Sequence, residues 1–125
     1  MIEEKSLVYL LLRIILGSIF IYHGISKLGA GYNSWIDYMN SKQISSLWAI
    51  AAIIAEIFIG VKILFGLYTR ISALGGLAFM IAALYIAHSN DPIFGEKGIS
   101  YQILIMLLCI GLALTGGGKY VVIKD

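Results

Sequence analysis

The sequence is poor in the residues on which many soluble enzymes and metal proteins depend. Its 125 residues include one cysteine, one proline and two histidines, and only 13% of them are charged. In a soluble domain about a quarter of the residues are charged, and a chain this short would leave much of its surface in water. Because 60% of the residues are hydrophobic, we predict a single membrane domain over residues 1–125.

The scarce residues also disfavour several kinds of site. Cys109 stands alone in an apolar run, so it has no internal disulfide partner, and no Cys/His spacing predicts zinc. A metal site of His23, Glu56 and His88 has suitable ligand types but no spacing signature. Haem would need the two histidines at equal depth, and their predicted depths differ. We therefore expect no metal and no haem.

Charge is equally limited. Nine basic and seven acidic residues give a formal net charge of +2, and they include no basic tract of the kind that binds nucleic acid. The chain begins Met-Ile-Glu-Glu-Lys, which is acidic where a signal peptide is basic. We therefore expect the first apolar stretch to stay in the mature protein.

Four apolar stretches are long enough to cross about 30 Å of hydrocarbon, which takes about 20 helical residues. They cover residues 7–28, 47–68, 71–88 and 99–118. The sequence therefore predicts an all-α integral membrane protein, a four-helix bundle with lipid around it.

The connections carry patterns of their own. In the longest one, Tyr32, Trp35 and Met39 recur at helical spacing, which is typical of a short helix in the headgroup layer. Residues 89–98 hold the only proline and predict a surface turn. The glycines at 116–118 predict the end of the last helix and the release of a short tail.

Basic residues predict the orientation. An even number of spans places both chain ends on one side, which would carry or adjoin six basic residues: Lys5, Arg13, Lys62, Arg70, Lys119 and Lys124. The other side has three: Lys27, Lys42 and Lys97. Because cytoplasmic loops carry an excess of Lys and Arg, we predict a multi-pass protein of the plasma (inner) membrane with both termini in the cytoplasm.

Polar side chains gather in the outer half of the predicted bundle, away from the chain ends. Ionisable groups at membrane depth are costly, so each needs a partner, water or a role. At 1.5 Å per residue, His23 lies roughly 7 Å and Glu56 roughly 13 Å from the outer face. Seven polar residues of this outer half come from the four spans: His23, Lys27, Glu56, Tyr85, His88, Tyr101 and Gln102.

Three of these residues are candidate catalytic groups. Glu56 shares a helical stripe with small residues, so it points at another helix, where a carboxylate needs a cation or a proton. His23 is explained equally well as a proton carrier and as a buried histidine whose ring nitrogens are hydrogen-bonded within the bundle. His88 at a helix end is also typical of a capping residue.

The candidate substrate-binding residues are Arg13, Lys27, Tyr85, Tyr101 and Gln102. Arg13, roughly 9 Å from the inner face, either meets Glu56 across the bundle or extends to that face. Lys27 is expected to extend its ammonium group to the interface.

Several short motifs follow one another along nearly the whole chain. Arg13 precedes an apolar run into His-Gly-x-x-Lys-Leu at residues 23–28, and Ala-Glu-x-x-x-Gly follows at residues 55–60. Gly-Leu-Tyr-Thr-Arg at residues 66–70, a span ending at His88 and a glycine-rich end to the fourth span complete the order. In this order the motifs resemble those of the DoxX family of small four-span membrane proteins.

The resemblance implies a protein similar to the membrane subunit of thiosulfate:quinone oxidoreductase, in a family first associated with a terminal quinol oxidase. The polar positions that match are Arg13, His23, Lys27, Glu56, Arg70 and His88. Many members have a Glu early in the fourth span where this chain has Gln102, and Gly-Pro-Gly where it has the glycines at 116–118. The first departure removes an acid that could share protons with His88.

Three functions are compatible with the sequence. The leading hypothesis is a subunit of a quinone-linked oxidoreductase or respiratory complex, in which the outer-half cluster binds a quinone or quinol and His23 or Glu56 exchanges its proton. The chain has no cysteine pair or nucleotide loop to supply electrons, so we expect a partner subunit or a homo-oligomer. The alternatives are a non-catalytic scaffold or assembly subunit and a small proton-coupled transporter, which the lack of an internal repeat disfavours.

Overall fold

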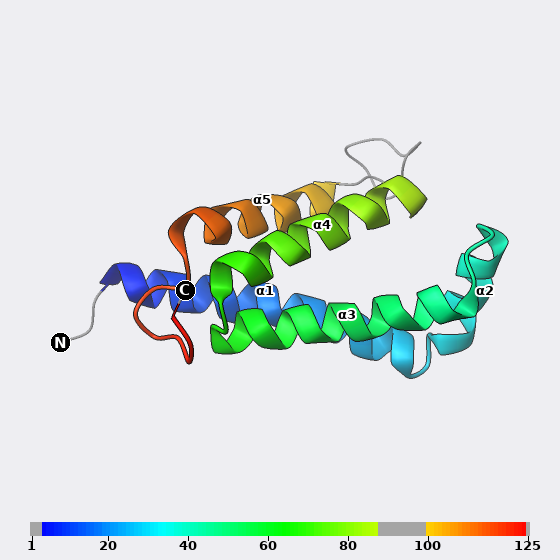
Figure 1. Cartoon of the computed structure of the whole chain (residues 1–125), viewed down its shortest axis with the longest axis horizontal. Coiled ribbons are helices and arrows are strands. Elements are labelled where there is room, and N and C mark those ends of the chain that lie inside the picture. Colours follow the sequence, from blue (N-terminus) through cyan, green and yellow to red (C-terminus); the bar gives the residue numbers. More distant parts are fainter. Residues whose placement is uncertain (1–3, 88–99, 125) are drawn as a thin grey trace.

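A computed structural model describes residues 4–87 and 100–124, which form five α-helices (Figure 1). They are α1 (Glu4–Leu28), α2 (Tyr32–Ser41), α3 (Ser46–Phe65), α4 (Thr69–Ala87) and α5 (Ser100–Thr115). One isolated bridge is the only β-type pairing among the described residues. The all-α fold is therefore confirmed, while the surface turn predicted at residues 89–98 lies outside the described residues.

The helices have the lengths of a membrane bundle. α1, α3 and α4 are long and apolar enough to span a bilayer, and α5 is a shorter apolar helix of 16 residues. At 1.5 Å per residue α5 covers about 24 Å. It ends at Thr115, short of the predicted end at residue 118, because Gly116 and Gly118 take positive φ angles of 78° and 83°.

α1 and α3 form a tight pair. A Cβ atom on Gly17 would lie 2.8 Å from the carbonyl oxygen of Gly60, and a Cβ atom on Gly60 would lie 2.8 Å from the carbonyl oxygen of Gly17. Small residues at both positions therefore let the two backbones approach each other, as helices in lipid commonly do. This contact fixes the crossing of α1 over α3.

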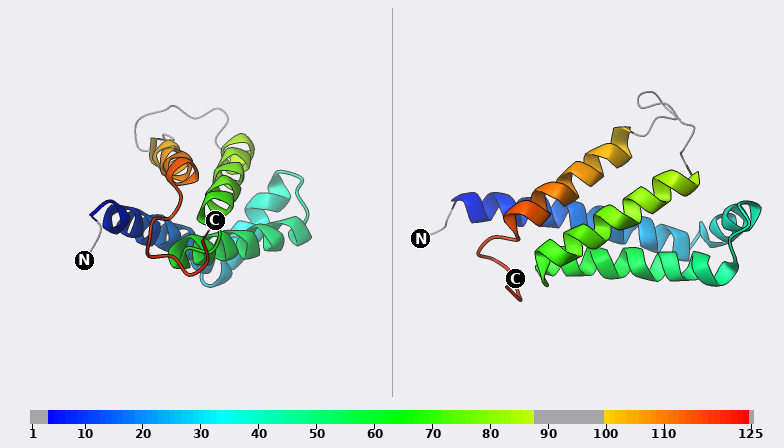
Figure 2. Two further views of the ribbon diagram at one scale, coloured as in Figure 1. Left: turned by 60° about the vertical axis from the view of Figure 1, so that its left-hand side comes forward. Right: turned by 45° about the horizontal axis from the view of Figure 1, so that its top comes forward.

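The core lies between the α1–α3 pair and the α4–α5 pair. Its buried members include Leu16, Phe20, Ile63, Ala73 and Cys109. Beyond this core, α4 and α5 diverge from α1 and α3 toward the end of the molecule that carries α2 (Figures 1 and 2). The molecule therefore has a closed end, where α3 joins α4, and an open end.

At the closed end, residues 116–124 fold back over the α3–α4 turn. The backbone N–H of Val122 donates to the carbonyl of Phe65 (3.0 Å), and that of Lys119 donates to the hydroxyl of Ser6 (3.0 Å). The predicted release of the tail is therefore wrong. Carbonyls at the end of a helix lack intrahelical donors, and the tail supplies one to the end of α3.

α2 crosses the open end (Figure 1). The indole N–H of Trp35 donates to the carbonyl of Ala49 at 3.0 Å, which fastens α2 to the start of α3. The Trp35 ring stacks on Tyr38 with centroids 6.2 Å apart, and Met39 is buried. The short helix predicted in the first connection is therefore confirmed.

Candidate ligand site

A cavity of about 890 Å³ lies between the diverging helices. Small-molecule sites commonly measure about 300–1,000 Å³ and combine apolar walls with a few polar groups. All five helices contribute to the lining, which is mainly apolar. Five of the seven predicted outer-half residues line it: His23, Lys27, Glu56, Tyr101 and Gln102.

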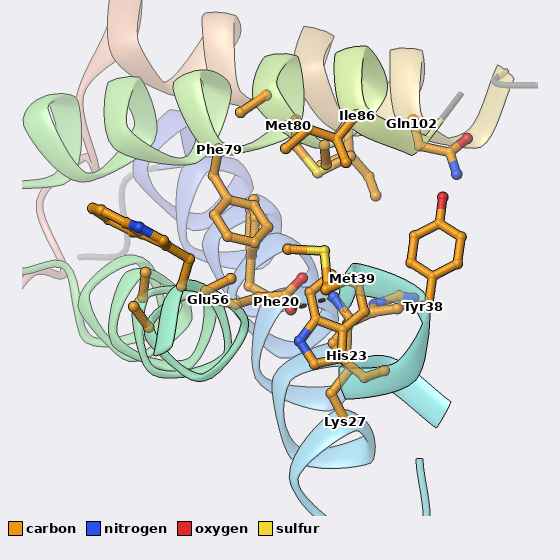
Figure 3. Close-up of a pocket in the computed structure, with 18 of the residues that line it drawn as sticks. Phe20, His23, Lys27, Tyr38, Met39, Glu56, Phe79, Met80, Ile86 and Gln102 are labelled. Carbon is orange, nitrogen blue, oxygen red and sulfur yellow. Dashed lines mark hydrogen bonds and ion pairs between the residues drawn. The ribbon is translucent and has the colours of Figure 1, made fainter. Parts of the chain in front are cut away.

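The polar groups lie on different walls of the cavity (Figure 3). Lys27 and Glu56 lie together on the α1–α3 side, whereas Gln102 lies on the opposite side with α4 and α5. Tyr38, from α2, points across toward Gln102. The cavity therefore offers charged groups on one wall and neutral polar groups near its α2 end.

Lys27 and Glu56 form an ion pair across the α1–α3 crossing. The ammonium Nζ donates to the carboxylate Oε1 at 2.9 Å, and the two side chains are 25% and 6% exposed. The same ammonium lies 4.5 Å from the centre of the Trp35 ring, a cation–π contact. The expectation that Lys27 extends to the interface is therefore wrong, because its charge has partners inside the bundle.

Arg13 serves a different part of the molecule. It is 1% exposed, and its guanidinium donates to the carbonyls of Gly117 (3.1 Å), Leu64 (3.1 Å) and Tyr120. It therefore does not meet Glu56, and it extends instead to the closed end, where backbone carbonyls take its donors in place of water. Proposed from sequence as a substrate contact, Arg13 lies at the closed end and is not among the residues that line the cavity.

His23 has a defined tautomer when neutral. Its Nδ1 lies 2.8 Å from the carbonyl oxygen of Ile19, and a carbonyl can only accept, so Nδ1 carries the hydrogen. The other ring nitrogen, Nε2, then holds the lone pair. The ring also lies 6.0 Å from that of Tyr101, which brings α1 and α5 together on one side of the cavity.

Gln102 brings an acceptor without a donor. Its Oε1 atom is buried and has no hydrogen-bond partner among the described residues. A buried polar atom left in that state costs about 1–3 kcal/mol. A ligand hydroxyl in the cavity would satisfy it.

Of the remaining two candidates, the structure describes only Tyr85. Tyr85 is 80% exposed and does not line the cavity. His88 lies outside the described residues. Within residues 4–87 and 100–124, no three His, Cys, Asp or Glu side chains are grouped so that they could hold a metal ion.

Sequence reasoning missed the contribution of α2. Trp35, Tyr38 and Met39 line the cavity, and so does Phe79 of α4. The helical spacing of the α2 residues was visible, but an amphipathic segment at that spacing equally fits a helix lying on the membrane surface. The contacts of Trp35 with the start of α3 and with Lys27 turn this face inward.

The class of protein follows from the fold, the site and the comparison with known families. The DoxX family model matches residues 8–89, and the chain belongs to this family. The match includes most of α1 and all of α2 to α4, with Lys27 and Glu56, and ends before α5.

Two curated relatives are similar over most of their length. The chain is 36% identical over 107 residues to "Putative oxidoreductase CatD" of Bacillus subtilis (strain 168), covering 86% of this chain and 78% of the relative. It is 32% identical over 115 residues to "Inner membrane protein YqjF" of Escherichia coli (strain K12), covering 89% and 85%. No solved structure matches the chain.

Proposed function

We propose that the protein is the membrane subunit of a quinone-linked oxidoreductase and that the cavity binds the quinone or quinol ring. The observation that carries this proposal is an apolar cavity of about 890 Å³ between membrane helices with an ion pair in its wall. Quinones are apolar rings with two polar oxygens, so they match walls of this composition. The name of the Bacillus subtilis relative supports the oxidoreductase part of the proposal.

On this proposal Lys27 binds a ring oxygen. An ammonium group has three N–H donors, and Glu56 takes one of them. Glu56 then serves as the counter-charge that keeps Lys27 in place at the cavity wall. Its pairing with Lys27 makes His23 the better candidate for proton exchange.

His23 would move the proton. The Nε2 lone pair, left by the bond between Nδ1 and Ile19, can accept a proton as quinol is oxidised and return it as quinone is reduced. Each quinol releases two protons and two electrons, of which His23 takes one proton and water at the open end of the cavity takes the other. The electrons pass to a partner subunit, since quinone chemistry needs a second redox carrier.

The relatives and the distribution of basic residues also support a cellular location for the protein. We propose the plasma (inner) membrane, in keeping with the name of the Escherichia coli relative. The start of α1 and residues 116–124 lie at the closed end (Figure 1). The excess of Lys and Arg at that end supports cytoplasmic termini, which would turn the open end and its cavity toward the outer face.

Binding by the purified protein tests the proposal. In nanodiscs, we expect Lys27→Met to raise the Kd for a short-chain quinone at least tenfold, measured by thermophoresis. Lys62→Met is the matched control, because Lys62 lies on α3 outside the cavity lining, with its Nζ 5.3 Å from the Phe58 ring centre. The control should stay within twofold of the wild type.

A second variant separates binding from folding. Lys27→Met with Glu56→Met removes both charges, so no unpaired carboxylate remains to disturb the bundle. It should fold and still bind the quinone weakly. Wild-type affinity in either variant would contradict a role for Lys27 in binding.

The scaffold alternative has one observation in its favour, since the pairing of Glu56 with Lys27 also suits a purely structural role. In native membranes the two functions separate. If the cavity handles quinol, Glu56→Gln lowers quinol-linked electron transfer at normal protein levels. If the chain is a scaffold, Glu56→Gln leaves the rate unchanged and only deletion of the chain destabilises the partner subunit.

A further inference from the structure

The two long sides of the cavity differ in what lines them. On the α1–α5 side, the rings of His23 and Tyr101 lie 6.0 Å apart. On the α3–α4 side, five alanines line the cavity beside the larger Trp48, Phe79, Met80 and Ile86: Ala51, Ala52 and Ala55 on α3, and Ala82 and Ala83 on α4. One side therefore has a ring from each of its two helices close together, whereas the other has small methyl groups on both of its helices, between larger apolar side chains.

The alanine-lined side reaches the surface of the bundle. Ala51 and Ala82 line the cavity and are also exposed. Toward the closed end α3 and α4 come together, since a Cβ atom on Gly75 would lie 4.0 Å from Ile59. Toward the open end the two helices diverge (Figures 1 and 2).

This opening lies at a depth where the surroundings are acyl chains. Ala51 comes five residues after Ser46, the first residue of α3, which places it about 8 Å along the helix axis. Ala55 comes one helical turn deeper. An apolar opening at this depth faces hydrocarbon, not water.

We propose that the ligand enters sideways from the bilayer, between α3 and α4, and that it is a lipid with a polar ring and a long apolar chain. The ring lies against Lys27 and Glu56, and the chain leaves along the alanines. This inference rests on the proposed function and narrows its ligand to chain-bearing isoprenoid quinones, in place of quinones in general.

The polarity of the cavity supports this occupant. The charged pair lies at one wall and the alanine methyl groups line the way out, so a single molecule with one polar and one apolar end satisfies both. A ring without a chain would fill only the part near Lys27. Large side chains at Ala51 or Ala82 should therefore obstruct the chain and spare the ring.

The test compares two ligands in nanodiscs: an isoprenoid quinone, and the same ring with a methyl group in place of the chain. We expect Ala51→Trp and Ala82→Trp each to raise the Kd of the isoprenoid quinone at least tenfold and to leave that of the methyl analogue within twofold. Ala78→Trp is the matched control, because Ala78 is exposed on α4 but does not line the cavity. It should change neither Kd.

The outcomes separate the two proposals. If the wild type binds both ligands and the two tryptophan variants weaken both equally, or weaken neither, lateral entry is wrong and the proposed function stands. If the wild type binds neither ligand, the proposed function fails and lateral entry fails with it. Selective loss of the chain-bearing quinone is the result that supports both.

Discussion

The two ends of the bundle use their polar groups in opposite ways. At the closed end, Arg13 sends its donors to three carbonyls, and the C-terminal tail supplies further donors to the backbone. At the open end, the helices diverge around the cavity, and Gln102 has a buried acceptor to which no described residue donates. One end is tied together by hydrogen bonds, and the other keeps the space that a ligand needs.

The largest loss of stability should come from Arg13. Arg13→Met leaves three carbonyls without their donor, and hydrogen bonds to a charged group contribute about 1.5–3 kcal/mol each. Part of this is offset because the variant no longer buries a charge. We expect the free energy of unfolding in mixed micelles to fall by about 3 kcal/mol or more.

Quinone binding provides the control for this variant. Once Arg13→Met protein is folded, its Kd should stay within twofold of the wild type, because Arg13 does not line the cavity. Weaker binding without a loss of stability would reverse the assignment of the two ends.

The next effect concerns the crossing that holds α1 against α3. Gly17→Ala places a methyl group 2.8 Å from the Gly60 carbonyl, so the helices must separate, and overpacking of this kind costs about 1–3 kcal/mol. Gly111→Ala on α5 is the matched control, because its Cβ would meet nothing within 4 Å. Alanine is the better helix former by about 1 kcal/mol, so Gly111→Ala should be neutral or stabilising in the same unfolding measurement.

The Lys27–Glu56 pair joins the stable crossing to the cavity. A double-mutant cycle with Lys27→Met and Glu56→Gln should give a coupling energy of about 1.5 kcal/mol, within the range for residues in contact. The same cycle with Lys62→Met should give a coupling near zero. A negligible coupling for Lys27 as well would mean that the pair adds nothing to stability and serves the ligand alone.

The sequence predicted the parts of the molecule that depend on local hydropathy. The long apolar runs and the spacing of Trp35 and Met39 sufficed for the membrane helices and for α2. The partners of Arg13 could not be predicted, because two of its acceptors are backbone carbonyls more than 100 positions away, and every residue has such a carbonyl.

The Lys27–Glu56 ion pair could more nearly have been predicted from the sequence. Lys27 lies on the same face of α1 as Gly17, and Glu56 lies on the same stripe of α3 as Gly60, so both charges point into the glycine crossing. The cavity wall was harder to predict, because alanines mark it by small volume, and a small side chain serves close packing and open space equally well.

The smallest effect compares the two ends directly. Among the residues that the structure describes, each end has one buried side-chain oxygen without a hydrogen-bond partner: Gln102 Oε1 at the cavity and Thr69 Oγ1 at the start of α4. Removing such an atom relieves its desolvation cost, so Gln102→Leu and Thr69→Val should each stabilise the fold by about 1 kcal/mol. Only Gln102→Leu should weaken quinol binding, by about fivefold, because a ligand hydroxyl no longer finds its acceptor. If Gln102→Leu instead destabilises the protein and leaves quinol binding unchanged, its amide belongs to the architecture of the bundle and the open end is not held ready for a hydroxyl donor.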